Sequence, residues 1–355
     1  MSGKKRLDPT IFNLPVEPMA AGYFSDKYFV RARDVLVADR HTPNVMMQVF
    51  CRTSAFLAGM DEAIAILKLC SPDWSALTVH ALYDGASISP WETVMTVAGP
   101  YHLFAHLETL YLGVLSRRTR IATNTRRVVD AARPKEIMFF PARHDLWSVQ
   151  AGDGYAAHLA GAASVSTDAQ ASWWNDLGVG TVPHALIAAY GGDTVLATRK
   201  LAEHTSAAVR LVTLVDFDNN CVDTSVSVAR ALGTRLYGVR LDTASTLVDQ
   251  SLIHEAGDPD LYRGVNEHLV VKVRQALNDA GFSKVKIIVS GGMTVEKIER
   301  FEKKGVPCDG YGVGSSLLSG QGTFDFTADI VMVNDTNCAK VGRENRPNPS
   351  LQPVD

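Results

Sequence analysis

Two glycine-rich segments near the end of the chain are the clearest candidates for chemistry. KIIVSGGMTVEKI and DGYGVGSSLL each place small residues directly after an apolar, β-rich run. Such residues let backbone N–H groups converge on an anion, and the helix that follows adds its dipole. We therefore predict a phosphate-binding site, with a pair of tight turns that bind nothing as the alternative. The residues concerned are Ser290, Gly291, Gly292, Gly312, Gly314 and Ser315.

Three further groups of residues carry reactive or charged side chains. Arg240 and Asp242 lie two apart in RLYGVRLDT, so in extended chain they point to the same face. Asp242 is suited to accept hydrogen bonds from ribose hydroxyls while Arg240 contacts an anion, and a surface ion pair is the alternative. His184 follows a threonine and a proline in GTVPHA, which predicts the first turn of a helix. An exposed imidazole there can be a nucleophile or a proton carrier, although a single histidine is more often a packing or capping residue.

FFPARHD combines Phe140, at the end of a predicted strand, with Arg143. An aromatic face beside one guanidinium suits a planar ring with a single carboxylate. A core phenylalanine beside a surface arginine explains the same residues equally well.

The elements that position these residues change along the chain. Residues 1–20 are predicted to form an arm and residues 21–117 an α+β domain, with helices expected over 55–70 and 99–115 and a strand over 77–83. From residue 118 to 320, short β-rich runs alternate with helical patterns, which favours βαβ units and a closed or nearly closed α/β barrel. We expect residues 321–355 to form a tail that ends as coil. Whether this tail packs back against the α+β domain stays open.

Composition excludes several classes of protein. With 46% hydrophobic and 21% charged residues the chain can bury a sizeable core, and its net charge of −3 gives no basic field for nucleic acid. No apolar run approaches the ~20 residues that span a membrane. Five cysteines without a CxxC pair argue against a disulfide framework or a zinc site, and we expect a cytoplasmic protein without bound metal.

Taken together, eight segments resemble the nicotinate phosphoribosyltransferase family, in the family's order from about residue 22 to residue 320. They are FSDKYF, LSRRTRIATNTRRVVDAA, FFPARH, GVGTVPHALIAAYGGDT, LVTLVDFDNN, VRLDT, SGGMT and GVGSSL. The resemblance implies type II architecture, in which an irregular α/β barrel accompanies a split α+β sandwich domain. It also implies a homodimer or higher homo-oligomer with active sites at the subunit interface.

The implied reaction joins nicotinate to phosphoribosyl pyrophosphate, in NAD biosynthesis, coupled to ATP hydrolysis through phosphorylated His184. By resemblance, Tyr28 stacks on the pyridine ring opposite Phe140, and Arg143 holds the ring carboxylate near Asp168. Asp242 grips the ribose with Arg240 beside it, and the two glycine-rich segments hold the 5′-phosphate. Arg52 contacts pyrophosphate across the interface, and Mg²⁺ arrives on the pyrophosphate.

Several alternatives remain open at this point. Asp168, in STDAQ, would repel the carboxylate of nicotinate but accept a hydrogen bond from an amide group, so nicotinamide is an alternative base. Quinolinate phosphoribosyltransferase shares the fold, but its TRKT segment is absent where this chain reads RPKEIMFFPARHD. A Schiff-base barrel enzyme is disfavoured because Lys284 and Lys286 begin their strand. A nucleotide-binding sensor without activity also stays open.

Overall fold

The computed structural model describes residues 5–319 and 323–355. The first four residues of the predicted arm, and the predicted junction of barrel and tail at 320–322, lie outside the described residues. The chain divides into two compact units, which we describe separately. Unit 1 holds residues 5–124, 151–160 and 323–355, and unit 2 holds residues 125–150 and 161–319.

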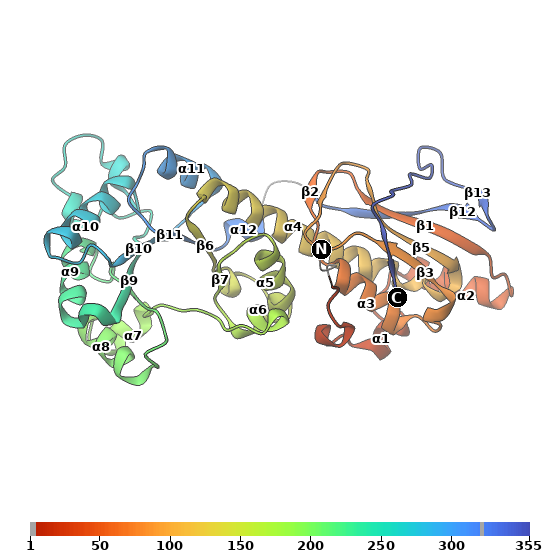
Figure 1. Cartoon of the computed structure of the whole chain (residues 1–355), viewed down its shortest axis with the longest axis horizontal. Coiled ribbons are helices and arrows are strands. Elements are labelled where there is room, and N and C mark those ends of the chain that lie inside the picture. The colour runs from red at the N-terminus through yellow and green to blue at the C-terminus, as the bar shows by residue number, and fades with distance from the viewer. Residues whose placement is uncertain (1–4, 320–322) are drawn as a thin grey trace. The chain divides into compact units, whose positions relative to one another are not determined.

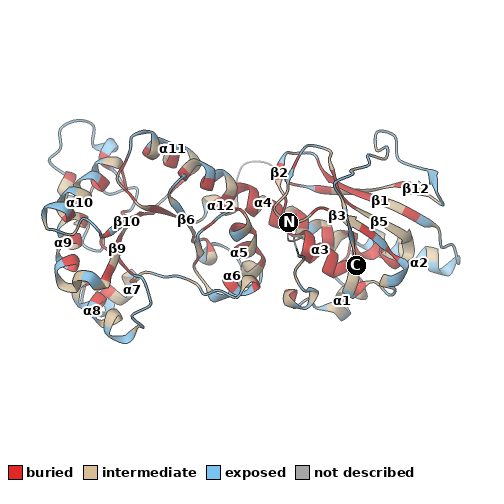
Figure 2. Cartoon of the chain, viewed as in Figure 1, coloured by how far each residue is buried: buried red, intermediate tan, exposed pale blue. Residues whose placement is uncertain are grey.

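Unit 1 is built on an antiparallel sheet with the strand order β13-β12-β1-β5-β3-β14, beside a small two-stranded sheet of β2 and β4. The strands are β1 (Asn44–Cys51), β2 (Ala55–Phe56), β3 (Thr78–Ala81), β4 (Ser87–Ile88), β5 (Thr93–Pro100), β12 (Phe326–Val333), β13 (Thr336–Asn337) and β14 (Gln352–Val354). The tail therefore supplies three strands, and the predicted coil at its end is wrong: Pro353 pairs with His80. One apolar core joins this sheet to α3 and the start of α4 (Figures 1 and 2).

Unit 1 holds the helices α1 (Val16–Ala20), α2 (Lys27–Ala38) and α3 (Met60–Cys70), the first part of α4 (Glu108–Ala132), which continues into unit 2 after Asn124, and nearly all of α5 (Gln150–Leu159). The predicted helix over 99–115 is wrong in its first half. The strand β5 continues to Pro100, two 3₁₀ turns follow, and the helix begins at Glu108. An apolar run without clear periodicity does not separate a buried strand from a helix, which explains the error.

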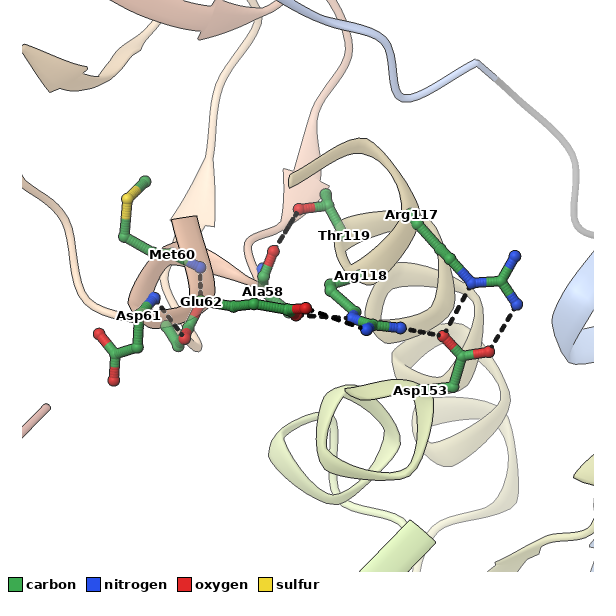
Figure 3. A network of polar contacts seen from close by, with 9 residues as sticks. Ala58, Met60, Asp61, Glu62, Arg117, Arg118, Thr119 and Asp153 are labelled. Atoms are coloured by element: carbon green, nitrogen blue, oxygen red, sulfur yellow. Dashed lines mark hydrogen bonds and ion pairs between the residues drawn. The ribbon is translucent and has the colours of Figure 1, made fainter. Parts of the chain in front are cut away.

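A buried ion network ties three helices of unit 1 together (Figure 3). The guanidinium of Arg118, on α4, lies 2.9 Å from Glu62 on α3 and 2.8 Å from Asp153 on α5. Arg117 adds a second bond to Asp153 at 2.8 Å. Buried charges are tolerated when each is paired in this way, and removing one partner leaves the others uncompensated.

Lowering the pH should reduce the stability of unit 1 through His106, whose side chain is fully buried. Burial and the nearby Arg33 lower the pKa of its imidazole to about 4. The unfolded chain takes up this proton near pH 6.5 and the folded chain only near pH 4, so stability falls as the pH drops between these values. We expect His106→Leu to remove about 2 kcal/mol of the difference in unfolding free energy between pH 7 and pH 5, measured by urea titration.

The nearby Glu108 acts with the opposite sign, because burial raises the pKa of its carboxyl to about 8. Its stabilising effect is present at low pH and is lost as the pH rises towards 8. Wild type and variant share this group, so it cancels in the comparison. Equal pH dependence in the two proteins would contradict the assignment to His106.

Unit 2 is a curled parallel sheet with helices around it, which confirms the predicted α/β fold (Figure 1). The strand order is β7-β6-β11-β10-β9-β8. The strands are β6 (Glu136–Phe139), β7 (Ser164–Val165), β8 (Leu211–Leu214), β9 (Leu236–Leu241), β10 (Lys286–Val289) and β11 (Gly310–Val313). The helices are α6 (Asp168–Ala171), α7 (His184–Ala189), α8 (Thr194–His204), α9 (Cys221–Leu232), α10 (Glu267–Asp279), α11 (Val295–Lys303) and α12 (Ser316–Ser319).

An extended segment, 178–182, joins the two edges of this sheet. The N–H of Val179 donates to the carbonyl of Val165 on β7 at 2.8 Å, and that of Val182 donates to Val212 on β8 at 2.9 Å. Because one short segment bonds to both edge strands, the sheet curls into an irregular barrel rather than lying open. Within the described ranges, no helix is long and apolar enough to cross a membrane.

Candidate functional site

The carboxyl ends of the parallel strands of unit 2 bring several of the predicted residues to one rim. Strands β9 and β10 pair in parallel with Arg240 opposite Ile288, and β11 pairs with β6 so that Val313 faces Phe139. Residues that follow these strands therefore emerge at the same edge, which is where α/β barrels collect their functional side chains.

Arg240, Ser290 and Asp242 form a connected polar group at this rim. The Arg240 Nε donates to Ser290 Oγ at 2.7 Å, and its Nη2 lies 3.0 Å from Asp242 Oδ2. Ser290 Oγ is 2.8 Å from the other carboxylate oxygen of Asp242. The side chain of Asp242 remains 21% exposed, so its carboxylate is fixed in orientation and still accessible to a ligand. A carboxylate held in this way is suited to accept two hydrogen bonds from vicinal hydroxyls.

Phe140 lies over the backbone of β11, beside Arg240. The Arg240 guanidinium carbon is 5.2 Å from the centre of the Phe140 ring. A Cβ at Gly312 would come within 2.8 Å of two carbons of that ring, so only glycine leaves room for it. Gly312 thus has a packing role in the placement of the aromatic face, in addition to the predicted role in a phosphate loop.

The two glycine-rich loops lie next to each other. The hydroxyl of Ser316, after β11, donates to the carbonyl of Met293, after β10, at 2.8 Å. Gly291 and Gly292 both have positive φ, at 82° and 64°, a conformation that side chains rarely adopt. Gly314 borders His144, and Ser315 is exposed at the same loop. Glycines in this conformation can turn successive backbone N–H groups towards one anion.

Lys297 is a residue of this region that the sequence reasoning missed. Lys297 lies in the first turn of α11, and its Nζ donates a hydrogen bond of 3.2 Å to the carbonyl of Gly291. Burial lowers the pKa of this lysine, with the nearby Arg300 as a further cause. Its position three residues after Thr294, the helix cap, was the available signal. The ammonium group places positive charge at the glycine loop.

His184 is held by a buried carboxylate. Its Nε2 lies 2.9 Å from Asp216 Oδ1; the aspartate side chain is 7% exposed and the histidine side chain 43% exposed. Burial raises the pKa of Asp216 although the hydrogen bond to His184 opposes this. With Nε2 engaged, Nδ1 is the ring nitrogen left for a reaction. Asp216 follows a predicted strand, but only the folded chain shows it to be the partner of His184.

Arg143 and Asp168 are less closely integrated. Arg143 lies in an exposed 3₁₀ turn, Ala142–His144. One oxygen of Asp168 accepts from the N–H of Gly178 at 2.9 Å, which anchors the start of the segment that joins the two sheet edges. No hydrogen bond or ion pair joins Arg143 to Asp168 among the residues described.

Tyr28 and Arg52 belong to unit 1. Tyr28, in the first turn of α2, is 62% exposed and its ring lies 4.2 Å from that of Phe29. Arg52 follows β1 and lies over the ring of Trp91 at 5.6 Å. In unit 2, by contrast, the structure connects Phe140, Arg240, Asp242 and Ser290 directly.

Both parts of the sequence match domains of a known protein family. Residues 26–119 match the N-terminal domain of the quinolinate phosphoribosyl transferase family, and residues 121–329 match its C-terminal domain. A nicotinate phosphoribosyltransferase of Mycobacterium tuberculosis is 29% identical over 243 residues, which cover 67% of this chain and 49% of that protein. This chain thus spans about half the length of the curated relatives it matches first.

Two solved structures extend the comparison. The crystal structure of nicotinate-nucleotide pyrophosphorylase from Pyrococcus furiosus aligns with a TM-score of 0.81 and 30% identity, covering 96% of this chain and 85% of that one. Human nicotinic acid phosphoribosyltransferase aligns with a TM-score of 0.68 and 17% identity, covering 91% of this chain and 77% of that one, which shows a shared fold. The chain therefore belongs to the quinolinate phosphoribosyl transferase family, the type II phosphoribosyltransferases.

Proposed function

We propose that this protein is a nicotinate phosphoribosyltransferase. It joins nicotinate to 5-phosphoribosyl 1-pyrophosphate, giving nicotinate mononucleotide and pyrophosphate for NAD synthesis, with ATP hydrolysed through a phosphohistidine. The family match supports phosphoribosyl transfer to a pyridine precursor, and the names of the curated relatives support nicotinate. The observation that carries the proposal is the Arg240–Ser290–Asp242 group beside the two glycine-rich loops.

This rim can position a ribose phosphate. The loops offer backbone N–H groups and the Lys297 ammonium to the 5′-phosphate, while Asp242 accepts from the ribose hydroxyls. Displacement at the anomeric carbon passes through a cationic, oxocarbenium-like state. A fixed carboxylate nearby stabilises that charge, so catalysis depends on positioning and electrostatics.

Mg²⁺ would arrive with the pyrophosphate group and neutralise part of its charge. Asp216 and Asp242, which interact electrostatically at this rim, are hard oxygen donors of the type that Mg²⁺ accepts.

The charge balance at the rim favours a base with one carboxylate. Asp242 already compensates Arg240, which leaves Arg143, exposed and three residues after Phe140 in the chain, as the guanidinium proposed for the ring carboxylate. Quinolinate, with two carboxylates, would need a second cation. It is the second candidate because the matching family bears its name. Nicotinamide is less favoured, because one Asp168 oxygen is already bonded to Gly178.

A product assay separates these bases. The protein is incubated with phosphoribosyl pyrophosphate and nicotinate, nicotinamide or quinolinate, each with and without ATP, and mononucleotide and carbon dioxide are measured. We expect nicotinate mononucleotide from nicotinate, formed faster with ATP and without carbon dioxide. Mononucleotide formed from quinolinate alone, with release of carbon dioxide, would overturn the proposal in favour of the second candidate.

His184→Gln should abolish the gain from ATP while leaving slow transfer intact. In the proposed step, Nδ1 attacks the γ-phosphorus of ATP, an N–P bond forms, and the bond to ADP breaks. Glutamine removes the nucleophile, so the ratio of rates with and without ATP should fall to one. The measurements are initial rates and acid-labile labelling by γ-labelled ATP. His204→Gln, an exposed histidine at the end of α8, is the matched control and should behave as wild type. Full ATP stimulation in His184→Gln would exclude the phosphohistidine.

A homodimer or higher homo-oligomer is part of the proposal. Tyr23, Phe24 and Tyr28 are exposed by 75%, 46% and 62%, more aromatic surface than a monomer usually leaves in water. A partner subunit would cover these rings and use Tyr28 against the pyridine. Sedimentation analysis of wild type and of Tyr28→Ala tests the assembly.

A further inference from the structure

Two loops of unit 2 carry functional carboxylates and are bonded to each other. The β8 loop, residues 215–221, follows β8 and carries Asp216, the partner of His184. The β9 loop, residues 242–251, follows β9 and begins with Asp242. Burial raises the pKa of the Asp216 carboxyl, and the negative charge of Asp242 adds to this. The two carboxylates therefore interact, and the placement of the two loops sets how strongly they do so.

The side chain of Asp249 joins the two loops. This residue is completely buried, at 0% exposure. One of its carboxylate oxygens accepts from the N–H of Cys221, in the β8 loop, at 2.8 Å. The other oxygen accepts from the N–H and the hydroxyl of Ser251, at 3.0 and 2.7 Å. One half of a buried carboxylate thus bonds the β8 loop, while the other half fixes the end of the β9 loop.

Asp249 also caps the helix that follows the β8 loop. Cys221 is the first residue of α9, and the preceding Asn220 makes no side-chain cap bond. The first N–H groups of a helix have no partners within the helix, and the helix dipole favours a negative charge beside them. The start of α9 therefore offsets part of the cost of burying the charge of Asp249.

Further hydrogen bonds run between the same two loops. Asn219 Nδ2 donates to the carbonyl of Val248 at 2.7 Å, and the N–H of Gln250 donates to the carbonyl of Asn219 at 2.9 Å. The side-chain amide of Gln250 donates to the carbonyl of Asp218, also at 2.9 Å. Asn219 has a φ of 54°, a left-handed conformation that asparagine adopts more readily than most residues. We call these contacts, together with the bond that Asp249 accepts from the β8 loop, the clasp.

A buried thiol extends the clasp to the neighbour of Asp242. The Cys221 Sγ lies 3.5 Å from the hydroxyl oxygen of Thr243, which is 3% exposed. Burial and the charge of Asp249 raise the pKa of this thiol, so it stays protonated and neutral. A single buried side chain therefore separates Asp249 from the residue that follows Asp242.

We propose that Asp249 is a positioning residue, which holds the β9 loop, and with it the carboxylate of Asp242, in place beside Asp216. Like charges repel, so two interacting carboxylates move apart unless the backbone that carries them is fixed. The clasp fixes that backbone, and a group that is already in place binds its ligand at a lower entropic cost. The inference rests on the proposed function for the identity of the ligand, phosphoribosyl pyrophosphate. It goes beyond that function because it gives a role to a residue outside the site described above.

The test is calorimetric titration of the full-length protein with phosphoribosyl pyrophosphate and Mg²⁺. Asp249→Asn keeps the size of the side chain but places an N–H₂ group where one oxygen accepts. We expect binding to weaken about fivefold to tenfold, because a misplaced Asp242 meets the ribose hydroxyls less well. Ser251→Ala is the matched control: it removes one bond of the same carboxylate within the β9 loop and should bind as wild type.

A second variant loosens the clasp without touching a buried charge. Asn219→Gly removes the amide that bonds Val248, and glycine keeps the left-handed backbone at no cost. Binding should weaken about twofold to threefold, with little change in the melting temperature. If Asp249→Asn does not fold, this variant replaces it in every comparison.

A double-mutant cycle with Asp242→Asn separates positioning from a general loss of structure. If Asp249 acts through Asp242, then Asp249→Asn should cost little further affinity once Asp242→Asn is present. Additive losses, or wild-type binding in both clasp variants, would overturn the inference.

The outcomes also separate the inference from the proposed function. Donor binding that depends on the clasp supports the inference, whichever base the enzyme accepts in the product assay. Donor binding that ignores the clasp overturns the inference, even if nicotinate mononucleotide is made. A wild-type protein that does not bind the donor would overturn both.

Discussion

Asp242→Asn is expected to lower kcat/KM for phosphoribosyl pyrophosphate by about 10²–10³-fold, the scale of one lost electrostatic contact to a transition state. The substitution keeps the shape of the side chain but removes its charge. Arg240, 3.0 Å away, and Ser290, 2.8 Å away, would then fix a neutral amide at the rim. A cationic anomeric carbon would lose its anionic neighbour, and one ribose hydroxyl would face an N–H₂ group instead of an acceptor.

Steady-state kinetics with varied donor measure this effect. Asp279→Asn is the matched control, because this exposed aspartate ends α10, on the side where β10 begins, and accepts from the amide of Gln275 at 2.8 Å. The control should keep wild-type kinetics. If Asp242→Asn kept more than a third of wild-type kcat/KM, the role given to this carboxylate would be wrong.

Gly152→Ala should cost about 3–5 kcal/mol of unfolding free energy, the usual penalty for breaking a buried ion pair. A Cβ at this position of α5 would come within 2.0 Å of the guanidinium carbon of Arg118. Arg118 is 8% exposed and bound on both sides, so the methyl group would displace it from Glu62 and Asp153. Both carboxylates would then be buried without their shared cation (Figure 3).

The chain offers a control with the same chemical change. Gly113, exposed in the interior of α4, has nothing within 4 Å of its ideal Cβ position. Gly113→Ala should therefore stabilise the protein by up to about 1 kcal/mol, because alanine is the better helix former. Urea unfolding of both variants measures the contrast. Similar stabilities for the two would show that Arg118 can move aside at little cost.

The parallel half of the fold was predictable because its patterns are local. The run RLYGVRLDT, predicted as extended chain, contains the strand 236–241, and the helix predicted after SGG in KIIVSGGMTVEKI spans 295–303. The strands of the tail could not be predicted from local patterns, because β12 forms by pairing with β1. In this pairing Val45 lies opposite Val333, which is far from it in the sequence. The part of α4 after residue 115 lacked a clear hydrophobic period for a different reason, because its buried residues include Arg118, three threonines and Asn124.

The site shows the same division. Arg240 and Asp242 could be paired from their spacing, and the glycine loops from their position after strands. The bond from His184 to Asp216 and the contact of Lys297 with Gly291 join residues that only the folded chain brings together.

A crystal structure of the protein with nicotinate mononucleotide is the most direct test of the central claim. We expect the 5′-phosphate within ~3 Å of backbone N–H groups in the loops 290–293 and 314–316, with the ribose hydroxyls on Asp242 and the pyridine against Phe140. A nucleotide bound elsewhere, with both loops empty and Asp242 still bonded only to Arg240 and Ser290, would contradict the assignment of this rim as the phosphoribosyl site.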